Sequence, residues 1–310
     1  MKKLITSLAL VLSALSSYAI TPLWMRDARI SPDGSEIVFC YKGDIYKVPA
    51  QGGTAVQLTT QTSYEANPVW SPDGKQIAFA SDRNGNFDLF IMPADGGAAR
   101  RLTYHSASEI PSAFTPDGKY VFFSASIQDP ASSALFPTGA MTELYKVPVA
   151  GGRTEQVLGT PAELVCFDKT GKNFLYQDRK GFEDEWRKHH TRDIWLYNTQ
   201  TGKHTNLTNR GGEDRNPVYA PDGNAIYFLS ERDGGSFNVY TFSLNTPQEV
   251  KAMTTFKTHP VRFLSVSDKG TLCYTYDGEL YTQKSGARPE KVKVELVRDD
   301  EQQLATLKFS

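Results

Sequence analysis

A short turn sequence recurs along this chain at intervals of 40 to 53 residues, and it restricts the fold more than any other feature. Its best copies read Ser-Pro-Asp-Gly, and the six copies begin at Ser31, Ser71, Thr115, Asp168, Ala220 and Ser267. The proline fixes φ at the first turn position, the aspartate can bond to its own backbone, and the glycine takes the left-handed conformation that ends the turn. Each copy therefore predicts a tight turn between two strands, in a unit as long as one blade of a β-propeller.

Each repeat unit carries apolar stretches for four strands. In the second unit these stretches are residues 68–70, 77–80, 88–92 and 99–103. Three outer stretches end in Leu-Thr, at residues 57–59, 101–103 and 206–208. We therefore predict an all-β chain that folds as a six-bladed β-propeller of four-stranded antiparallel blades. An open β-solenoid is the rival architecture, but its coils are usually shorter than these units.

The positions of the turns set the expected domain boundaries. Residues 1–19 form a signal peptide, residues 20–297 the propeller, and residues 298–310 a linker into a next domain. The blades are expected near residues 24–60, 64–104, 108–159, 162–209, 214–256 and 258–297. The first and sixth units each hold four strands of their own, so we predict closure without strand exchange, by face-to-face packing of these two blades. Residues 304–309 read as an unpartnered strand, which indicates either the front piece of a longer protein or a frayed tail.

The first 19 residues have the pattern of a secretory signal. Lys2 and Lys3 precede an apolar run at residues 4–15, and Ser17 and Ala19 are the small residues of a cleavage site after Ala19. The run is too short for a membrane span, which needs about 20 apolar residues. We therefore expect a periplasmic or otherwise exported protein, with an uncleaved anchor as the alternative.

Charge and cysteine content narrow the classes of partner. The formal net charge is −1, so no basic excess points to nucleic acid. Cys40, Cys166 and Cys273 lie far apart in apolar stretches, and we expect none of them to form a disulfide. No later stretch is apolar enough to cross a membrane after signal cleavage. The oligomeric state stays open.

Further residues of the second unit carry a family resemblance. They are Asn-Pro-Val-Trp at residues 67–70, Ser-Asp-Arg at residues 81–83 and Arg-Leu-Thr at residues 101–103. This unit resembles the WD-like propeller repeats of TolB and of tricorn-type proteases. In addition, residues 176–195 and the opening Leu-Trp-Met-Arg-Asp at residues 23–27 are similar to the N-terminal propeller of tricorn-protease homologues.

The resemblance implies a particular place in a longer enzyme. In that family a six-bladed propeller precedes a second propeller, a PDZ domain and a serine-peptidase domain. The propellers are expected to filter or guide peptides toward the active site. Because the family's catalytic residues lie in the later domains, the resemblance assigns no catalytic residue to this chain.

The residues themselves carry no motif for chemistry. No nucleophile elbow, zinc-protease motif or phosphate-binding loop occurs, so we expect no catalytic site, no cofactor and no metal. Turn chemistry explains the recurrent aspartates without a metal; they are Asp33, Asp73, Asp117 and Asp222. His189 and His190 follow the acidic residues 183–185, which leaves zinc as a weaker alternative, because the spacing matches no strong pattern.

One face of the ring is expected to carry the contacts. The long connections at residues 127–142 and 178–192 share this face with the connections between blades, and binding residues concentrate in loops on a rigid scaffold. The candidate contact residues are Tyr64, Glu65, His105, Phe182, Trp186, His189, His190, Arg210, Asp214 and Arg215. Their rings and mixed charges suit a peptide, and packing against downstream domains of the same polypeptide is an equal alternative.

These features favour a non-catalytic propeller of an exported tricorn-like serine peptidase, which gates or guides peptides or serves domain assembly. The alternative is a free-standing, TolB-like propeller that binds another envelope protein. TolB carries an α/β domain before its propeller, and residues 19–25 leave no room for one. A third reading, the propeller of a prolyl-oligopeptidase-type enzyme, requires a hydrolase domain downstream.

Overall fold

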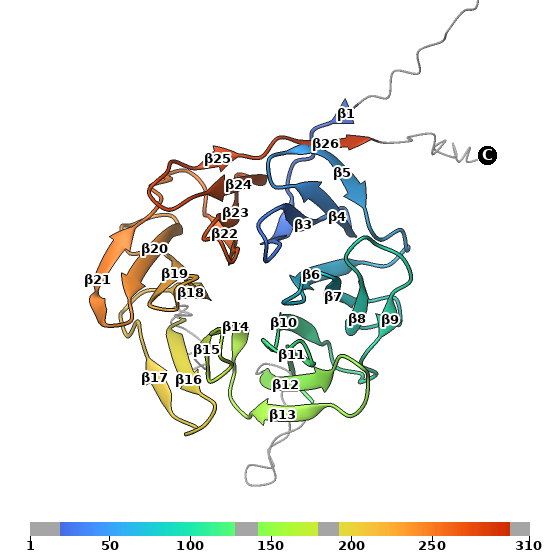
Figure 1. Cartoon of the computed structure of the whole chain (residues 1–310), viewed down its shortest axis with the longest axis horizontal. Helices are drawn as coiled ribbons and strands as arrows, with labels where there is room; N and C mark the ends of the chain where they lie inside the picture. The colour runs from blue at the N-terminus through green and yellow to red at the C-terminus, as the bar shows by residue number, and fades with distance from the viewer. Residues whose placement is uncertain (1–18, 128–141, 179–191, 298–310) are drawn as a thin grey trace, which may run out of the picture.

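Strands and tight turns alternate along the chain and form a ring of six blades (Figure 1). The computed structural model describes residues 19–127, 142–178 and 192–297. Each blade is an antiparallel sheet whose own four strands follow one another outward from the central axis. The predicted six-bladed, all-β propeller is therefore confirmed. Within the described ranges no helix is long and apolar enough to cross a membrane.

The strands follow the order of the repeat units. Blade one contains β2 (Arg26–Ile30), β3 (Glu36–Tyr41), β4 (Asp44–Pro49) and β5 (Gly53–Gln57), and blade two contains β6 (Glu65–Trp70), β7 (Gln76–Ser81), β8 (Asp88–Pro93) and β9 (Arg100–Arg101). Blade three contains β10 (Ile110–Phe114), β11 (Tyr120–Ala125), β12 (Glu143–Pro148) and β13 (Glu155–Leu158), and blade four contains β14 (Glu163–Phe167), β15 (Asn173–Gln177), β16 (Ile194–Asn198) and β17 (His204–Asn206). Blade five contains β18 (Asp214–Tyr219), β19 (Ala225–Ser230), β20 (Asn238–Ser243) and β21 (Thr246–Ala252), and blade six contains β22 (Arg262–Val266), β23 (Leu272–Tyr276), β24 (Glu279–Gln283) and β25 (Glu290–Lys291).

The repeated turn is held by its own side chains. In blade two, Ser71 Oγ donates to Asp73 Oδ1 at 2.6 Å and accepts a hydrogen bond from the Gln76 amide at 2.9 Å. The Gly74 amide donates to the Ser71 carbonyl, and the glycine has a φ of 68°. Blades one and three repeat this pattern. These hydrogen bonds lower the pKa of the Asp73 carboxyl, and the recurrent aspartate serves the turn, as turn chemistry predicts.

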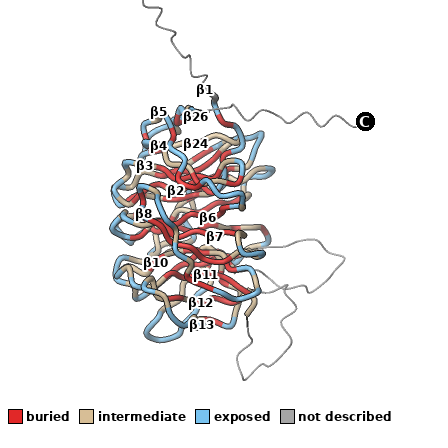
Figure 2. Tube along the Cα trace, turned by 90° about the vertical axis from the view of Figure 1, so that its right-hand side faces the viewer, coloured by how far each residue is buried: buried red, intermediate tan, exposed pale blue. Residues whose placement is uncertain are grey.

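An aromatic pair joins the second and third strands of every blade. The two rings lie directly opposite in register, with centroids 5.7 to 6.4 Å apart. The pairs are Phe39–Tyr46, Phe79–Phe90, Phe123–Tyr145, Tyr176–Trp195, Phe228–Tyr240 and Tyr274–Tyr281. The second-strand ring of each pair is buried, and buried residues fill the middle of the strands while exposed residues lie in the loops (Figure 2). Each blade thus has its own aromatic pair between its second and third strands.

The ring closes between blades six and one by more than face-to-face packing. The Met25 amide donates to the Gly278 carbonyl at 2.9 Å, and equivalent hydrogen bonds join four other pairs of neighbouring blades. β26 (Val294–Val297) then runs parallel to β5 along the outer edge of blade one, and β1 (Ala19–Ile20) pairs with the far side of β26 (Figure 1). Each blade keeps four strands of its own, as predicted, but closure by packing alone is wrong. Without β26, the backbone groups along the outer edge of β5 would have no strand partner, and β26 pairs with them.

The three cysteines are free, as predicted. Cys40 and Cys273 are buried and Cys166 is half-buried. Burial raises the pKa of all three thiols. They therefore act as small apolar residues of the strands in which they lie.

Candidate functional site

We call the region along the axis of the ring, between the innermost strands, the channel. On the side of the Pro-Asp-Gly turns this region holds a cavity of about 530 Å³. Every blade contributes lining residues, among them Arg29, Trp70, Phe114, Cys166, Val218 and Ser265. Burial lowers the pKa of the Arg29 guanidinium, and the nearby Asp27 opposes this shift. The wall of this cavity therefore combines a guanidinium with apolar side chains, and Asp168, Lys169 and Asp268 also line it.

The opposite end of the channel, where the innermost strands begin, has an uneven distribution of charge. Pairing between the first and second strands makes six residues structurally equivalent there: Arg26, Ala66, Ile110, Glu163, Arg215 and Arg262. Blades five, six and one are neighbours in the ring, and each presents an arginine at this position. We call Arg26, Arg215 and Arg262 the arginine arc.

Two hollows of about 350 Å³ each lie along the arginine arc, and Arg262 lines both. The first hollow is bounded by blades four, five and six, and its lining includes Gln177, Arg192, Arg215, Glu231 and Phe237. The second lies at the junction of blades six and one, and its lining includes Trp24, Arg26, His259, Phe263 and Asp277. The two hollows share Pro260, Arg262 and Phe263, so they adjoin at Arg262.

The arginines of the arc differ in how far their charge is neutralised. Arg215 donates to Glu213 at 2.6 Å, and its guanidinium lies 4.2 Å from the centroid of the Phe237 ring. Arg26 and Arg262 are exposed, and the ion pairs of the described ranges include neither of them. The two exposed guanidinium groups of the arc therefore both line the hollow between blades six and one.

Trp24 stands at the edge of that hollow with 70 % of its side chain exposed. Its φ of 67° lies in the left-handed region, which residues with a large side chain rarely adopt. Close packing holds the backbone there, because a Cβ on Gly278 would lie only 2.7 Å from the Trp24 nitrogen. The fold therefore displays an indole on a constrained backbone, and such constraint concentrates at functional sites.

Two of the predicted contact residues, Glu65 and Asp214, lie fully buried inside their blades. Glu65 Oε1 accepts a hydrogen bond from Arg83 Nη2 at 2.9 Å. In blade five, Arg210 and Arg232 pair with Asp214, at 3.0 and 3.2 Å. These carboxylates form ion pairs inside their blades, so they are not available to a ligand.

The other predicted contact residues lie in different places. Tyr64 and His105 are exposed on connections between blades, and Arg210 is half-buried beside Asp214. Arg215 lies in the arginine arc. Phe182, Trp186, His189 and His190 lie outside the described residues, as do residues 128–141 and 179–191 of the two predicted contact loops.

Sequence reasoning missed Arg26 and Arg262, although a signal for them was present. All six equivalent residues lie five positions before the first residue of their turn. An alignment of the units on their turns would have shown arginine in three of the six places. The predicted contact residues were taken from the connections between blades and from the two long loops, and not from this strand position.

Glu109 belongs to the same series as Glu65 and Asp214 but lacks their arginine. The backbone amide of each donates to a carbonyl of the preceding blade, which makes the three positions equivalent. In blade three, Ala125 and Ile127 take the places that the serine and arginine occupy in blade two. Burial raises the pKa of the Glu109 carboxyl to about 7.

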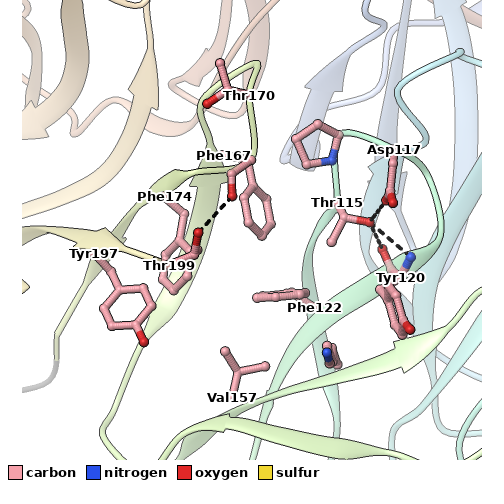
Figure 3. Close-up of a pocket in the computed structure, with 13 residues that line it drawn as sticks. Thr115, Asp117, Tyr120, Phe122, Val157, Phe167, Thr170, Phe174, Tyr197 and Thr199 are labelled. Atoms are coloured by element: carbon pink, nitrogen blue, oxygen red, sulfur yellow. Dashed lines mark hydrogen bonds between the residues drawn. The ribbon is translucent and has the colours of Figure 1, made fainter. Parts of the chain in front are cut away.

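A third hollow, of about 470 Å³, lies between blades three and four (Figure 3). Its walls are aromatic: Phe122 and Phe167 meet edge to face with centroids 4.9 Å apart, and Phe174 and Tyr197 lie beside them. At its rim, the side chains of the blade-three turn bond to one another. This hollow therefore offers mainly apolar contacts.

Comparison with known proteins identifies the family of this propeller. The model of a family described as the tricorn protease N-terminal beta propeller domain matches residues 22–288. A dipeptidyl-peptidase 5 from Porphyromonas gingivalis is 27 % identical over 258 residues, which cover 68 % of this chain and 38 % of that protein. The chain thus spans less than half the length of this relative.

Two solved structures have the same fold. The crystal structure of the tricorn protease matches with a TM-score of 0.71 at 22 % identity, over 87 % of this chain and 26 % of that one. TolB from Acinetobacter baumannii matches with a TM-score of 0.65 at 19 % identity, over 87 % of this chain and 64 % of that one. At these identities the likeness concerns the fold alone.

Proposed function

This chain belongs to the tricorn protease N-terminal β-propeller family, and on that premise we propose that it is the non-catalytic propeller of an exported, tricorn-like serine peptidase. In this role it gates or guides peptides toward a catalytic domain elsewhere in the same polypeptide, or holds the domains of the enzyme together. The observation that carries the proposal is the family match over residues 22–288, because it spans almost the whole ring and not one repeat.

The geometry of the ring supports contact with peptides. The channel has a wide cavity at one end and a charged, hollowed mouth at the other. The strands beneath that mouth fix the backbone positions of its residues, which lowers the entropic cost of binding an extended segment. A peptidase domain in the same polypeptide would receive peptides that this surface has already oriented.

Export is part of the proposal. The signal pattern of residues 1–19 supports it, and the predicted cleavage after Ala19 would leave Ile20 at the new N-terminus. Ile20 pairs with Leu296 of β26, so the contact between the two ends of the ring would survive processing.

A free-standing, TolB-like propeller is the second candidate. The observation that favours it is the match to TolB, of which this chain covers 64 % with a TM-score of 0.65. In that case the ring would bind another protein of the cell envelope and would serve no catalytic domain of its own.

One experiment separates the two candidates. Cell fractions from the native organism are blotted with an antibody raised against the 310-residue chain, with marker proteins for the cytoplasm and the periplasm as controls. We expect a periplasmic band far above the 34.4 kDa of this chain. A periplasmic band just below that mass would support the TolB-like candidate. A band in the cytoplasmic fraction would contradict export.

A further inference from the structure

We propose that the arginine arc and Trp24 form a recognition site for peptide segments that carry acidic side chains beside an apolar one. The inference rests on the proposed function and adds to it the class of peptide that the channel mouth selects. The groups that the site recognises are the side-chain carboxylates of the peptide.

The charge of the arc is the first argument. Arg26 and Arg262 occupy equivalent positions in neighbouring blades, and both line the hollow at the junction of blades six and one. Within the described ranges, no carboxylate forms an ion pair with either guanidinium. A guanidinium has a planar fork of donors that matches a carboxylate in two parallel hydrogen bonds. Two such forks in one hollow suit a segment that carries more than one acidic side chain.

Nearby acidic groups leave this charge in place. Asp277 lies in the same hollow, but its Oδ1 is 3.4 Å from His259 Nε2. In the neighbouring hollow, Glu213 pairs with both Arg192 and Arg215. Glu213 therefore has cationic partners of its own. Asp277 has a histidine beside it, and the buried Asp27 interacts with Arg26, so the two exposed guanidinium groups keep part of their charge for a ligand.

Trp24 supplies the apolar half of the site. Its exposed indole borders the same hollow, and Leu23 beside it is also exposed. The tight approach of Gly278 fixes the backbone that carries the indole. A preformed aromatic surface costs little entropy when it binds, and tryptophan is enriched among the residues that dominate binding energy.

The asymmetry of the ring gives the bound segment a preferred side. Opposite the arc, blades two, three and four place Ala66, Ile110 and Glu163 at the equivalent positions. Ala66 and Ile110 offer no charge, and Glu163, which lies 4.0 Å from Arg192, offers no cation to an acidic segment. An acidic segment at the mouth is therefore held over blades five, six and one.

Binding of two capped peptides to the 310-residue chain tests the inference. The acidic peptide is acetyl-Gly-Phe-Asp-Glu-Gly-amide, and the neutral one carries Asn and Gln in place of Asp and Glu. Because both termini are blocked, only the side-chain carboxylates differ. Isothermal titration calorimetry at low salt should show about tenfold tighter binding of the acidic peptide, and 0.5 M NaCl should reduce this preference.

Three variants locate the site. The double variant Arg26→Gln/Arg262→Gln should bind both peptides with equal affinity. Arg288→Gln, an exposed arginine on a turn of the same blade six, is the matched control and should keep the preference. Trp24→Ala should weaken both peptides by a similar factor and leave their ratio unchanged. All four substitutions remove exposed side chains, so thermal unfolding should match that of the wild type.

The outcomes distinguish this inference from the function on which it rests. Equal binding of the two peptides by the wild type would overturn acidic recognition and leave the peptide-guiding role standing. A preference that survives in Arg26→Gln/Arg262→Gln would overturn the location of the site. No binding of either peptide would contradict both the site and the peptide-guiding role.

Discussion

At the scale of single residues, threonine hydroxyls fix the outer strand of a blade to the strand inside it. Thr59 Oγ1 accepts a hydrogen bond from the Ile45 amide at 2.9 Å and donates to Asp44 Oδ1 at 3.0 Å. Blades two, four and five repeat the amide-to-threonine bond. The Leu-Thr ending of the outer strands is thus explained, since the leucine packs in the core and the threonine caps a backbone donor.

Two adjacent threonines test this role. Thr59 is 6 % exposed and Thr60 is exposed. Thr59→Val keeps the shape but leaves the buried Ile45 amide without an acceptor, so the free energy of unfolding should fall by about 1–3 kcal/mol. Thr60→Val should change it by less than about 0.5 kcal/mol. Urea unfolding followed by circular dichroism measures both, and equal effects would show that the hydroxyl has no special part.

Glu109 makes stability depend on pH in an unusual direction. Its carboxyl is 1 % exposed. Burial raises its pKa from 4.5 to about 7, and Asp88 adds to this shift while Thr103 and Arg101 oppose it. Between these two pH values the folded chain holds a proton that the unfolded chain has released. Stability therefore falls as the pH rises through this window, by roughly 3 kcal/mol at most.

The variant Glu109→Gln should remove this dependence. It should unfold like the wild type at pH 4.5 and at a higher urea concentration than the wild type at pH 8. The matched control is Glu65→Gln at the equivalent position of blade two, which leaves the Arg83 guanidinium without its carboxylate and should destabilise the protein at pH 8. A Glu109→Gln protein that is less stable than the wild type at pH 8 would refute the argument.

At the scale of elements, β26 is the strand that ties the two ends of the propeller together. Val294 and Leu296 of β26 lie in one apolar cluster with Ala55 of β5, while Val297 points outward. The strand therefore combines backbone pairing with burial of every second side chain, as an inner strand of a sheet does. Ring closure thus depends on a strand that adds to a blade already complete.

Two valines of β26, one buried and one exposed, allow the role of this strand in ring closure to be tested apart from surface effects. Val294 is 1 % exposed and Val297 is 58 % exposed. Val294→Ala should lower the free energy of unfolding by roughly 2 kcal/mol, because it removes buried methyl groups and leaves a cavity. Val297→Ala, in the same strand, should leave it nearly unchanged. Differential scanning calorimetry of the two variants compares them directly, and similar melting temperatures would argue against the role of β26.

The elements that could be predicted are those with a local signal. The turn at Ser71 carries its proline, aspartate and glycine within four residues, so its structure followed from those residues alone. β26 could not be found in this way, because its partner β5 lies more than two hundred residues earlier and no repeat marks the pair. Parallel pairing of distant segments depends on closure of the whole ring, which no window of sequence contains.

At the scale of the whole molecule, the predicted contact residues include only one residue of the arginine arc. Arg215 was identified, whereas Arg26 and Arg262 became visible only when pairing aligned the innermost strands. Glu65 and Asp214 were predicted as contacts because they precede strands on the loop side. The Ser-Asp-Arg and Ser-Glu-Arg sequences at residues 81–83 and 230–232 supply the arginines that bury them.

The pairing of β1 with β26 also has a mechanical consequence. Ala19 lies opposite Val297, so the path of the chain enters and leaves the ring at one point on its rim. Tension on the chain beyond Val297 acts first on the pairs that hold β26 to β1 and β5. β26 lies between that end and β25, the last strand of blade six, so β26 would detach from the rim before the pull reaches the blade.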